Sequence, residues 1–328
     1  MILSRTPLRI SFFGGGTDFP EYFRDHPQGG AVLGTAIDKY IYHSVIPFHS
    51  QLFDYNIRIA YRQVECVSSL DEIEHRPFRE VLKYMGVDRD IEIGLTADLP
   101  SLSGLGSSSS FVVGLINALQ AYCGRQVSRI QLAYDAIKIE REVLKESVGC
   151  QDQVFAAVGG LDLVEFHDVD NISVQRIPLA RERMDELDAS LLLFFTGIRR
   201  RAEEVEKRKI QNLDKIRDYL SELRSLVDEA HTRLIGNGPL EAFGELLDRT
   251  WQLKKNLDDG VSNASIDDMY RTGREAGALG GKLLGAGGGG FMLFYVPRER
   301  QAALREAMSA YYEIPFHINS GGSQIVHS

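Results

Sequence analysis

The chain has few cysteines and no long apolar run, and each shortage excludes a class of protein. Its 328 residues include three cysteines, Cys66, Cys123 and Cys150, whose spacing fits neither a zinc site nor a disulfide framework. The longest apolar stretch, near residues 191–195, is too short to span a bilayer, and the N-terminus lacks the apolar core of a secretory signal. We therefore expect a protein of the reducing cytoplasm with no membrane partner.

Positive charge is also in short supply. The 37 lysines and arginines are outnumbered by 46 aspartates and glutamates, which gives a formal net charge of -9. This balance argues against a protein that binds nucleic acid through a broad basic surface. It still permits an anionic small molecule, because a few local cations and backbone amides suffice to bind one.

The pattern of strands and helices predicts an α+β protein of two closely joined domains, because 328 residues exceed one ordinary hydrophobic core. Alternating and β-branched residues predict strands at 8–13, 36–45, 57–67, 91–97, 161–166, 172–177, 189–195 and 291–296. Helical spacing predicts helices at 71–85, 107–122, 128–145, 199–234, 240–256, 265–277 and 298–312. We expect the domains to comprise residues 1–160 and 161–328.

The longest predicted helix carries an apolar stripe whose members are spaced three and four residues apart: Leu213, Ile216, Leu220, Leu223, Val227, Ala230 and Leu234. Such a stripe packs inside one molecule or forms the seam of a coiled-coil dimer. About five heptads at most favour packing within the molecule. The sequence leaves monomer and homodimer open.

A glycine- and serine-rich stretch, Leu99 to Ser110, follows a predicted strand and opens a predicted helix. Glycines allow close approach of the backbone, and the free amides of a helix start favour phosphate. A flexible loop ending in an ordinary serine cap is the alternative. The stretch is neither a Walker sequence nor a dinucleotide-binding fingerprint, which argues against a nicotinamide-dependent dehydrogenase.

Two carboxylates lie at positions that suit substrate binding or catalysis. Asp18 ends the glycine turn 14–16 after a strand that contains Arg9, and it either binds a sugar hydroxyl or stabilises the turn. Asp152 follows a glycine break and precedes an apolar run, which suggests partial burial. A buried carboxylate near a cation such as Arg9 can stay ionised and accept a hydroxyl proton. Glu140, late in a helix, indicates little by itself.

The segment 280–290 contains seven glycines, more than a tight turn requires: Gly280, Gly281, Gly285, Gly287, Gly288, Gly289 and Gly290. We interpret it as backbone packed closely against a ligand or another glycine loop. A plain mobile loop is the alternative.

These stretches, in this order, resemble the GHMP kinases, a superfamily that includes galactokinase, homoserine kinase, mevalonate kinase and phosphomevalonate kinase. The resemblance rests on Pro100 followed by Gly104-Leu105-Gly106-Ser107-Ser108, together with the late glycine loop. It implies an N-terminal domain like domain 2 of ribosomal protein S5, with a left-handed β-α-β crossover, and a ferredoxin-like C-terminal domain. The active site would lie between them and use ATP and Mg²⁺.

The resemblance also implies roles for individual residues. Asp152 looks like the base of sugar kinases, Arg9 like its orienting cation, and Ser108 and Glu140 like the magnesium ligands. The ATP phosphates would lie over Ser103, Gly104, Leu105, Gly106, Ser107, Ser108 and Ser109. The substrate would contact Gly15, Gly16, Thr17, Asp18, Gly287 and Gly288.

The sequence departs from galactokinases, which carry Gly-Glu-His-Thr-Asp where this chain has Gly14-Gly15-Gly16-Thr17-Asp18. Galactose is therefore not expected. The triple glycine, together with Gly29-Gly30-Ala31-Val32-Leu33 and Ala36-Ile37-Asp38-Lys39-Tyr40 downstream, looks most like bacterial D-glycero-D-manno-heptose 7-phosphate kinases, which phosphorylate the anomeric hydroxyl. Arg199, at the start of a basic triplet, and Lys282 are candidates to bind the phosphate of such a sugar phosphate. A kinase for fucose or another free sugar, and a catalytically silent sugar sensor, remain alternatives.

Overall fold

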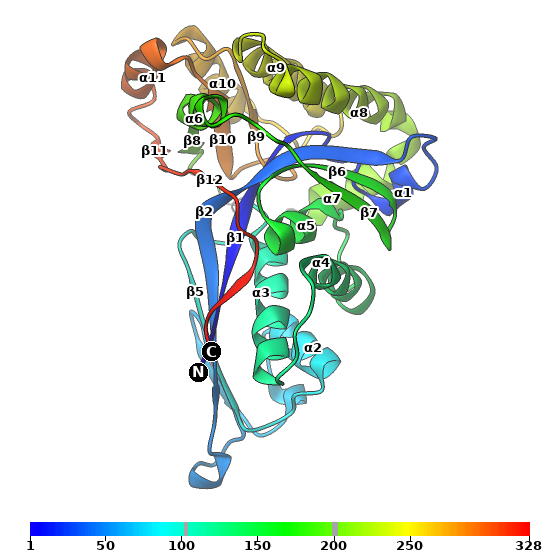
Figure 1. Ribbon diagram of the computed structural model, residues 1–328, viewed down its shortest axis with the longest axis vertical. Helices are drawn as coiled ribbons and strands as arrows, with labels where there is room; N and C mark the ends of the chain where they lie inside the picture. The colour runs from blue at the N-terminus through cyan, green and yellow to red at the C-terminus, as the bar shows by residue number, and fades with distance from the viewer. Residues whose placement is uncertain (102–103, 199–202) are drawn as a thin grey trace.

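The computed structural model describes residues 1–101, 104–198 and 203–328. Within these residues the strands form one nine-stranded and one four-stranded sheet, with helices packed against both. The predicted α+β class is confirmed. Figure 1 shows the larger sheet running down the length of the molecule, with the smaller sheet at the upper end.

The larger sheet is built on two long antiparallel strands, β1 (Ile2–Phe13) and β2 (Gly30–Pro47), paired from Ile2↔Val45 to Phe13↔Leu33. β2 is longer than predicted, and its other edge is shared mainly by two strands, with a short C-terminal strand between them. Its first half pairs with β6 (Leu161–Asp168) and its second half with β5 (Ile91–Ala97). The predicted strand 57–67 is a hairpin of β3 (Ile57–Ala60) and β4 (Val64–Val67).

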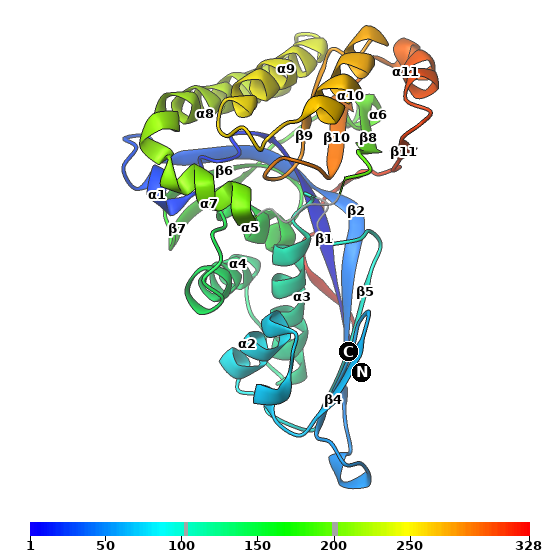
Figure 2. The same ribbon diagram turned by 180° about the vertical axis from the view of Figure 1, so that it is seen from behind.

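One face of β1 and β2 is covered by α3 (Ser107–Tyr122), which has the predicted bounds. A β-carbon at Gly114 in this helix would lie 2.6 Å from the hydroxyl of Thr6, so glycine allows the helix to lie close against the sheet. Around α3 lie α2 (Arg76–Met85), α4 (Arg129–Lys138) and α5 (Gln151–Val158), as Figures 1 and 2 show.

The smaller sheet is antiparallel, in the order β11 (Tyr312–Glu313), β8 (Leu191–Phe195), β10 (Phe291–Tyr295) and β9 (Gly280–Leu283). Nearby lie α6 (Arg181–Ser190), α10 (Ala264–Glu275) and α11 (Gln301–Ala307). The sequence did not predict β9, because its two glycines are poor strand formers.

The predicted boundary at residue 160 does not coincide with the division between the sheets. β6 and β7 (Asn171–Arg176) continue the larger sheet beyond that boundary. Near the C-terminus, β12 (Ile318–Asn319) pairs with β2 and β13 (Gln324–His327) pairs with β1. The two chain ends therefore lie side by side (Figure 1).

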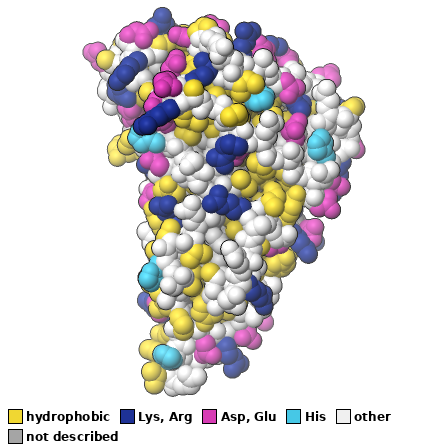
Figure 3. Space-filling model, viewed as in Figure 1, with side chains coloured by type: hydrophobic (Ala, Val, Ile, Leu, Met, Phe, Trp, Pro, Cys, Tyr) yellow, Lys and Arg dark blue, Asp and Glu magenta, His cyan; other side chains and the backbone are white. Residues whose placement is uncertain are grey.

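The long predicted helix is interrupted at Asn212, between α7 (Glu203–Gln211) and α8 (Leu213–Ile235). The apolar stripe of α8 packs on β1, β2 and α9 (Glu241–Lys255), which confirms packing within the molecule. None of the helices in the described residues is long and apolar enough to cross a membrane. On the face in Figure 3, basic and acidic side chains are interspersed.

Candidate active site

A cavity lies where the glycine turn after β1 meets the N-terminal ends of α3 and α5. α7, α9 and the glycine-dense loop after β9 complete its wall. Asp152 in the first turn of α5 and Arg9 on β1 both line it. Both sheets therefore contribute residues to one site.

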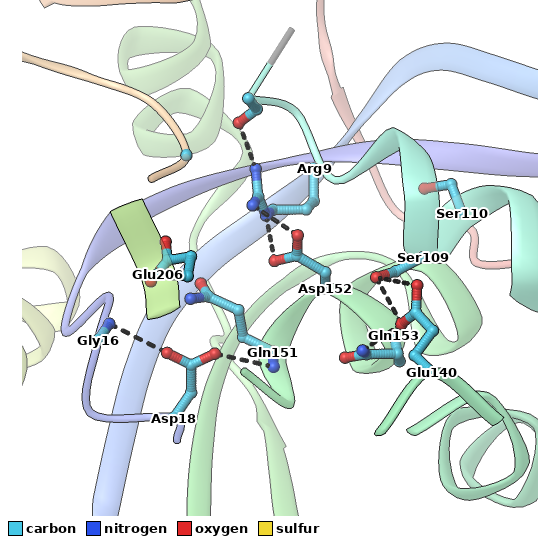
Figure 4. A network of polar contacts seen from close by, with 12 residues as sticks. Arg9, Gly16, Asp18, Ser109, Ser110, Glu140, Gln151, Asp152, Gln153 and Glu206 are labelled. Carbon is cyan, nitrogen blue, oxygen red and sulfur yellow. Dashed lines mark hydrogen bonds and ion pairs between the residues drawn. The ribbon is translucent and has the colours of Figure 1, made fainter. Parts of the chain in front are cut away.

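Arg9 and Asp152 form a bidentate pair. Arg9 Nε donates to Asp152 Oδ1 at 2.7 Å, and Nη2 donates to Oδ2 at 2.7 Å. Nη1 donates to the carbonyl of Gly104 at 2.7 Å, so one guanidinium connects the carboxylate with the glycine loop (Figure 4). The side chain of Asp152 keeps 25% of its surface exposed. Its carboxylate is thus fixed in orientation and still accessible to a ligand.

The register of β1 helps to aim Arg9 at the cavity. The pairing with β2 shifts between Pro7 and Arg9, and such irregularities re-aim side chains. The backbone N–H of Arg9 donates to the carbonyl of Leu105 at 3.0 Å. Leu105 itself is fully buried, so its side chain supports the loop, and only its backbone is left to contact ATP.

The start of α3 suits a phosphate. Gly104 and Gly106 adopt φ of 77° and 74°, which favours glycine, and no side chain of the residues that the structure describes caps the first amides. A β-carbon at Gly106 would lie 3.2 Å from Asp152 Oδ2. Ser107, Ser108 and Ser109 line the cavity beside these amides, whose position at a helix N-terminus favours anions. Ser103 lies outside the described residues.

The two glycine-rich loops contact each other. A β-carbon at Gly285 would lie 2.6 Å from the Cα of Gly104, so the predicted close packing of backbone against a second glycine loop is confirmed. The N–H of Gly288 donates to the carbonyl of Val261 at 2.9 Å, while its neighbours Gly287 and Gly289 line the cavity.

Asp18 is buried at the opposite wall, with Gly15 and Gly16 beside it. It accepts hydrogen bonds from the N–H groups of Gly16 at 3.0 Å and Gln151 at 3.2 Å (Figure 4). Burial, followed by the charge of Asp152, raises the pKa of Asp18 to about 6. The carboxylate therefore stabilises the turn, as one interpretation predicted, and it also faces the cavity, where a ligand hydroxyl could reach it.

Thr17 does not face a ligand. Its hydroxyl donates to the carbonyls of Gly14 and Ala31 at 2.8 Å and accepts from the N–H of Ala31 at 3.1 Å, and the side chain is fully buried. Its predicted substrate contact is corrected: Thr17 joins the turn to β2.

Three polar atoms around Asp18 have no hydrogen-bond partner within the described part of the chain: Ser11 Oγ, Gln151 Oε1 and Glu206 Oε2. All three residues line the cavity. Buried acceptors without partners are costly to a folded protein, and this group suits a ligand rich in hydroxyl donors. Sequence reasoning missed all three; the position of Gln151 next to Asp152 was the available signal.

Glu140 lies in a π-helical turn, Ile139–Val143, that extends α4. It is fully buried and accepts hydrogen bonds from Ser109 Oγ, at 2.8 and 3.1 Å, and from Gln153. Burial, and then the charge of Glu146, raises the pKa of Glu140 to about 8. The structure thus pairs Glu140 with Ser109 rather than Ser108. Both serines line the cavity, whereas Glu140 lies behind them.

The oxygen atoms at and near Glu140 are suitable ligands for magnesium. Hydroxyl and carboxylate oxygens are the ligands this ion prefers, and Glu140 has no cationic partner among the residues that the structure describes. A bound cation would supply the missing charge. No cluster of three or more acidic, histidine or cysteine side chains that could hold a metal occurs in the described ranges, so a ligand phosphate would have to complete the coordination.

Three buried lysines line the same cavity. Lys282 Nζ donates to the carbonyl of Phe12 at 2.8 Å, Lys209 Nζ to Ala286 at 2.9 Å, and Lys254 Nζ to Leu283 at 2.8 Å. Burial, followed by the charge of Arg9, lowers the pKa of Lys282 to about 7, and burial also lowers the pKa of Lys254.

Lys282 was predicted from the sequence, whereas Lys209 and Lys254 were missed, because lysines on amphipathic helices usually face solvent. Arg199 lies outside the described residues. The cavity therefore combines a held carboxylate, a free helix start, unpartnered acceptors and a group of cations.

Comparison with known proteins gives two family matches. The model "GHMP kinases N terminal domain" matches residues 75–160, and "GHMP kinases C terminal" matches residues 232–314. The D-glycero-alpha-D-manno-heptose 7-phosphate kinase of Campylobacter jejuni is 30% identical over 94% of this chain and 93% of that protein. The L-fucokinase/L-fucose-1-P guanylyltransferase of Bacteroides fragilis is 27% identical over 93% of this chain and 35% of its own length.

Among solved structures, a D-glycero-D-manno-heptose 1-phosphate kinase from Bacteroides thetaiotaomicron superposes with a TM-score of 0.80. It is 25% identical, and the match covers 100% of both chains.

Proposed function

This chain belongs to the GHMP kinase family and is an ATP-dependent sugar kinase, and from that premise we propose its acceptor and its catalytic residues. The acceptor is D-glycero-D-manno-heptose 7-phosphate, the reacting group is the anomeric hydroxyl, and the product is the 1,7-bisphosphate. This product would serve the synthesis of nucleotide-activated heptose and surface polysaccharide.

The observation that carries the catalytic assignment is the bidentate pair of Arg9 and Asp152. Arg9 holds both oxygens of Asp152 and also the carbonyl of Gly104, so the carboxylate stands next to the loop proposed to bind the ATP phosphates. A hydroxyl between Asp152 and that loop gives its proton to the carboxylate while its oxygen attacks the γ-phosphorus. The bond from phosphorus to the ADP oxygen breaks as the new bond forms.

Charge that develops on the transferred phosphoryl group is stabilised by fixed donors. The free amides at the start of α3 and the guanidinium of Arg9 supply them. Ser108 at the cavity and Glu140, together with the Ser109 hydroxyl that Glu140 accepts from, would hold magnesium, which would neutralise the β- and γ-phosphates when bound. Asp152 orients the acceptor as well as accepting its proton, so most of the acceleration comes from positioning.

The acceptor wall supports a polyhydroxylated substrate. Asp18 and the unpartnered oxygens of Ser11, Gln151 and Glu206 offer acceptors to several hydroxyl groups. The full-length similarity to the Campylobacter jejuni enzyme supports a heptose phosphate. The similarity to a fucokinase supports a second candidate, a kinase for fucose or another free sugar. A sugar sensor without catalysis is less well supported, because Arg9 and Asp152 are both present and paired.

The proposed setting is a cytoplasmic enzyme, either monomer or homodimer, whose partner is a small sugar phosphate. The test measures ATP consumption with magnesium and compares D-glycero-D-manno-heptose 7-phosphate with free heptose, mannose, fucose and galactose. Strong preference for the phosphorylated heptose, with a new phosphate at the anomeric carbon, is the expected result. Turnover of a free sugar alone would overturn this acceptor, and silence on every acceptor despite ATP binding would favour a sensor.

A further inference from the structure

We propose that Lys209 and Lys254 form the subsite for the phosphate that the acceptor already carries. This inference rests on the proposed function, in which the acceptor is a sugar phosphate, and it identifies the residues that select it. The two lysines come from different helices, α7 and α9.

The two ammonium groups are brought close to each other by one short segment of backbone. Lys254 Nζ donates to the carbonyls of Leu283 and Gly285, at 2.8 and 2.5 Å, and Lys209 Nζ donates to Ala286 at 2.9 Å. Both residues are 6% exposed, and both line the cavity. Two buried lysine donors therefore converge on one part of the cavity wall.

Hydrogen-bonding capacity remains at both lysines. An ammonium group has three protons to donate. Lys254 uses two of them on carbonyls, and Lys209 uses one on Ala286 and directs another to Glu206 at 3.5 Å. One proton of each lysine is left for a ligand oxygen, and phosphate oxygens are strong acceptors for such donors.

The charges at this wall call for an anion. Lys254 forms no ion pair among the described residues, and within electrostatic range it has three cations, Lys282, Lys209 and Arg9, and one carboxylate, Glu206. Like charges at short range in a buried site repel one another. A phosphate monoester carries about -1.5 to -2 charges at neutral pH, so its binding between Lys209 and Lys254 offsets that repulsion.

The position of α7 assigns these lysines to the acceptor rather than to ATP. Lys209 lies one helical turn beyond Glu206, and Glu206 stands over Gly16 and Gln151 at the wall that holds Asp18 (Figure 4). The charge of Glu206 contributes to the raised pKa of Asp18. The phosphates of ATP already have the amides of α3 and the guanidinium of Arg9. Lys209 therefore lies on the acceptor side of the cavity, and Lys254 is joined to it through the backbone of residues 283–286, so we assign both to an acceptor whose reacting hydroxyl lies at Asp152.

The test compares Lys209→Gln and Lys254→Met with the wild-type protein. Matched controls are Lys207→Gln and Lys255→Gln, which alter exposed or half-exposed lysines on the same two helices. For each protein, kcat and KM are measured with D-glycero-D-manno-heptose 7-phosphate, with free D-glycero-D-manno-heptose, and with varied ATP. Thermal unfolding verifies that each variant folds.

Each cavity variant should raise the KM for the phosphorylated heptose by about 10- to 100-fold, the effect of losing a charge-assisted hydrogen bond. The KM for ATP and kcat/KM for the free heptose should change less than about threefold, as should all constants of the controls. Equal losses with both acceptors, or a rise in the KM for ATP, would overturn this inference while leaving the proposed function intact.

Inorganic phosphate gives a second readout that needs no variant. It should inhibit the wild-type protein in competition with the phosphorylated heptose and not with ATP. Competition with ATP alone would overturn the assignment even if Lys254→Met fails to fold. Failure of the proposed function appears in the wild type by itself, as turnover of free sugars only, and would remove this inference with it.

Discussion

The carboxylate of Asp18 occupies the space in which a side chain at position 149 would stand. A β-carbon on Gly149 would lie 1.9 Å from Asp18 Oδ2, and Asp18 is too deeply buried to move aside. The next residue, Cys150, donates its N–H to the carbonyl of Asp18 at 2.9 Å. Gly149 thus permits the start of α5 and the glycine turn to meet around Asp18.

Gly149→Ala should displace the Asp18 carboxylate and weaken acceptor binding. We expect the KM for the acceptor to rise by about 100-fold, the effect of a misplacement of about 1 Å, with the KM for ATP little changed. Steady-state kinetics with each substrate varied measures both. Gly238→Ala is the matched control, because a β-carbon there meets nothing within 4 Å. An unchanged acceptor KM in Gly149→Ala would contradict the role of Asp18.

Asp152→Asn should lower kcat by about 10²- to 10⁴-fold, the usual contribution of a general base. The amide cannot take a proton from the acceptor, although it keeps a hydrogen-bond acceptor for Arg9. Nucleotide affinity, measured by calorimetry, should stay within about threefold. The control is Asp170→Asn, an exposed carboxylate between β6 and β7. A near-normal rate in Asp152→Asn would remove the base assignment.

Acceptor binding should depend on pH through Asp18. Because the pKa of Asp18 is raised from 3.8 to about 6, protonation below pH 6 removes an acceptor for sugar hydroxyls, and the acceptor KM should rise. In Asp18→Asn the KM should be high at every pH and show no such rise. Measuring KM from pH 5 to 8 tests this, and a wild-type KM that stays flat across pH 6 would exclude Asp18 from substrate binding.

The same shift affects stability with a defined sign. Between pH 3.8 and about 6 the folded state keeps a proton on Asp18 that the unfolded chain has lost, so this group's contribution to stability falls as the pH rises through that range. Asp18→Asn should therefore be stabilised relative to wild type more at pH 7 than at pH 4. Urea unfolding at the two pH values gives the comparison.

His43 should make the protein sensitive to acid. It is fully buried against Phe111, neither ring nitrogen has a hydrogen-bond partner within the described residues, and burial lowers its pKa to about 3. The unfolded chain takes up a proton below its ordinary pKa of 6.5, so stability is lost as the pH falls from 6.5 towards 3. Within this range, each pH unit lowers the free energy of unfolding by about 1.4 kcal/mol.

Between pH 6.5 and 5, His43→Leu should therefore lose about 2 kcal/mol less stability than the wild-type protein loses. Urea unfolding at both pH values measures the difference, and His49→Gln, an exposed histidine on the loop after β2, is the control. An identical loss in His43→Leu and wild type would show that His43 is already protonated in the folded protein.

Several elements of the fold follow from local sequence. α3 has the predicted bounds, Ser107–Tyr122, because a glycine loop precedes it and apolar residues follow at helical spacing. The hairpin of β3 and β4 was predicted as one strand, because its turn, Tyr61-Arg62-Gln63, contains neither glycine nor proline. β9 was missed because a strand that begins with two glycines is stabilised by its neighbour β10 rather than by its own propensity.

The chemical centre was also largely predictable. Arg9, Asp18, Asp152 and the loop around Gly104 carry residue types that suit the chemistry in a recognisable order, and the structure brings them to one cavity. Which serine contacts Glu140 was not predictable from the sequence. Successive helix residues point about 100° apart, so Ser109 faces Glu140 while Ser108 stays exposed at the cavity.

The sequence by itself determined the class of the fold and marked the glycine- and serine-rich loop before α3, because both depend on residue types and short spacings. The resemblance to the GHMP kinases linked Arg9 with Asp152, which are 143 positions apart. Only the tertiary structure decided that Thr17 is a turn residue and that Glu206, Lys209 and Lys254 belong to the site. From the sequence alone, charged residues on amphipathic helices are expected to face solvent. They become site residues here because α7 and α9 pack over a cavity whose other walls come from β1, the glycine turn and the starts of α3 and α5, all much earlier in the sequence.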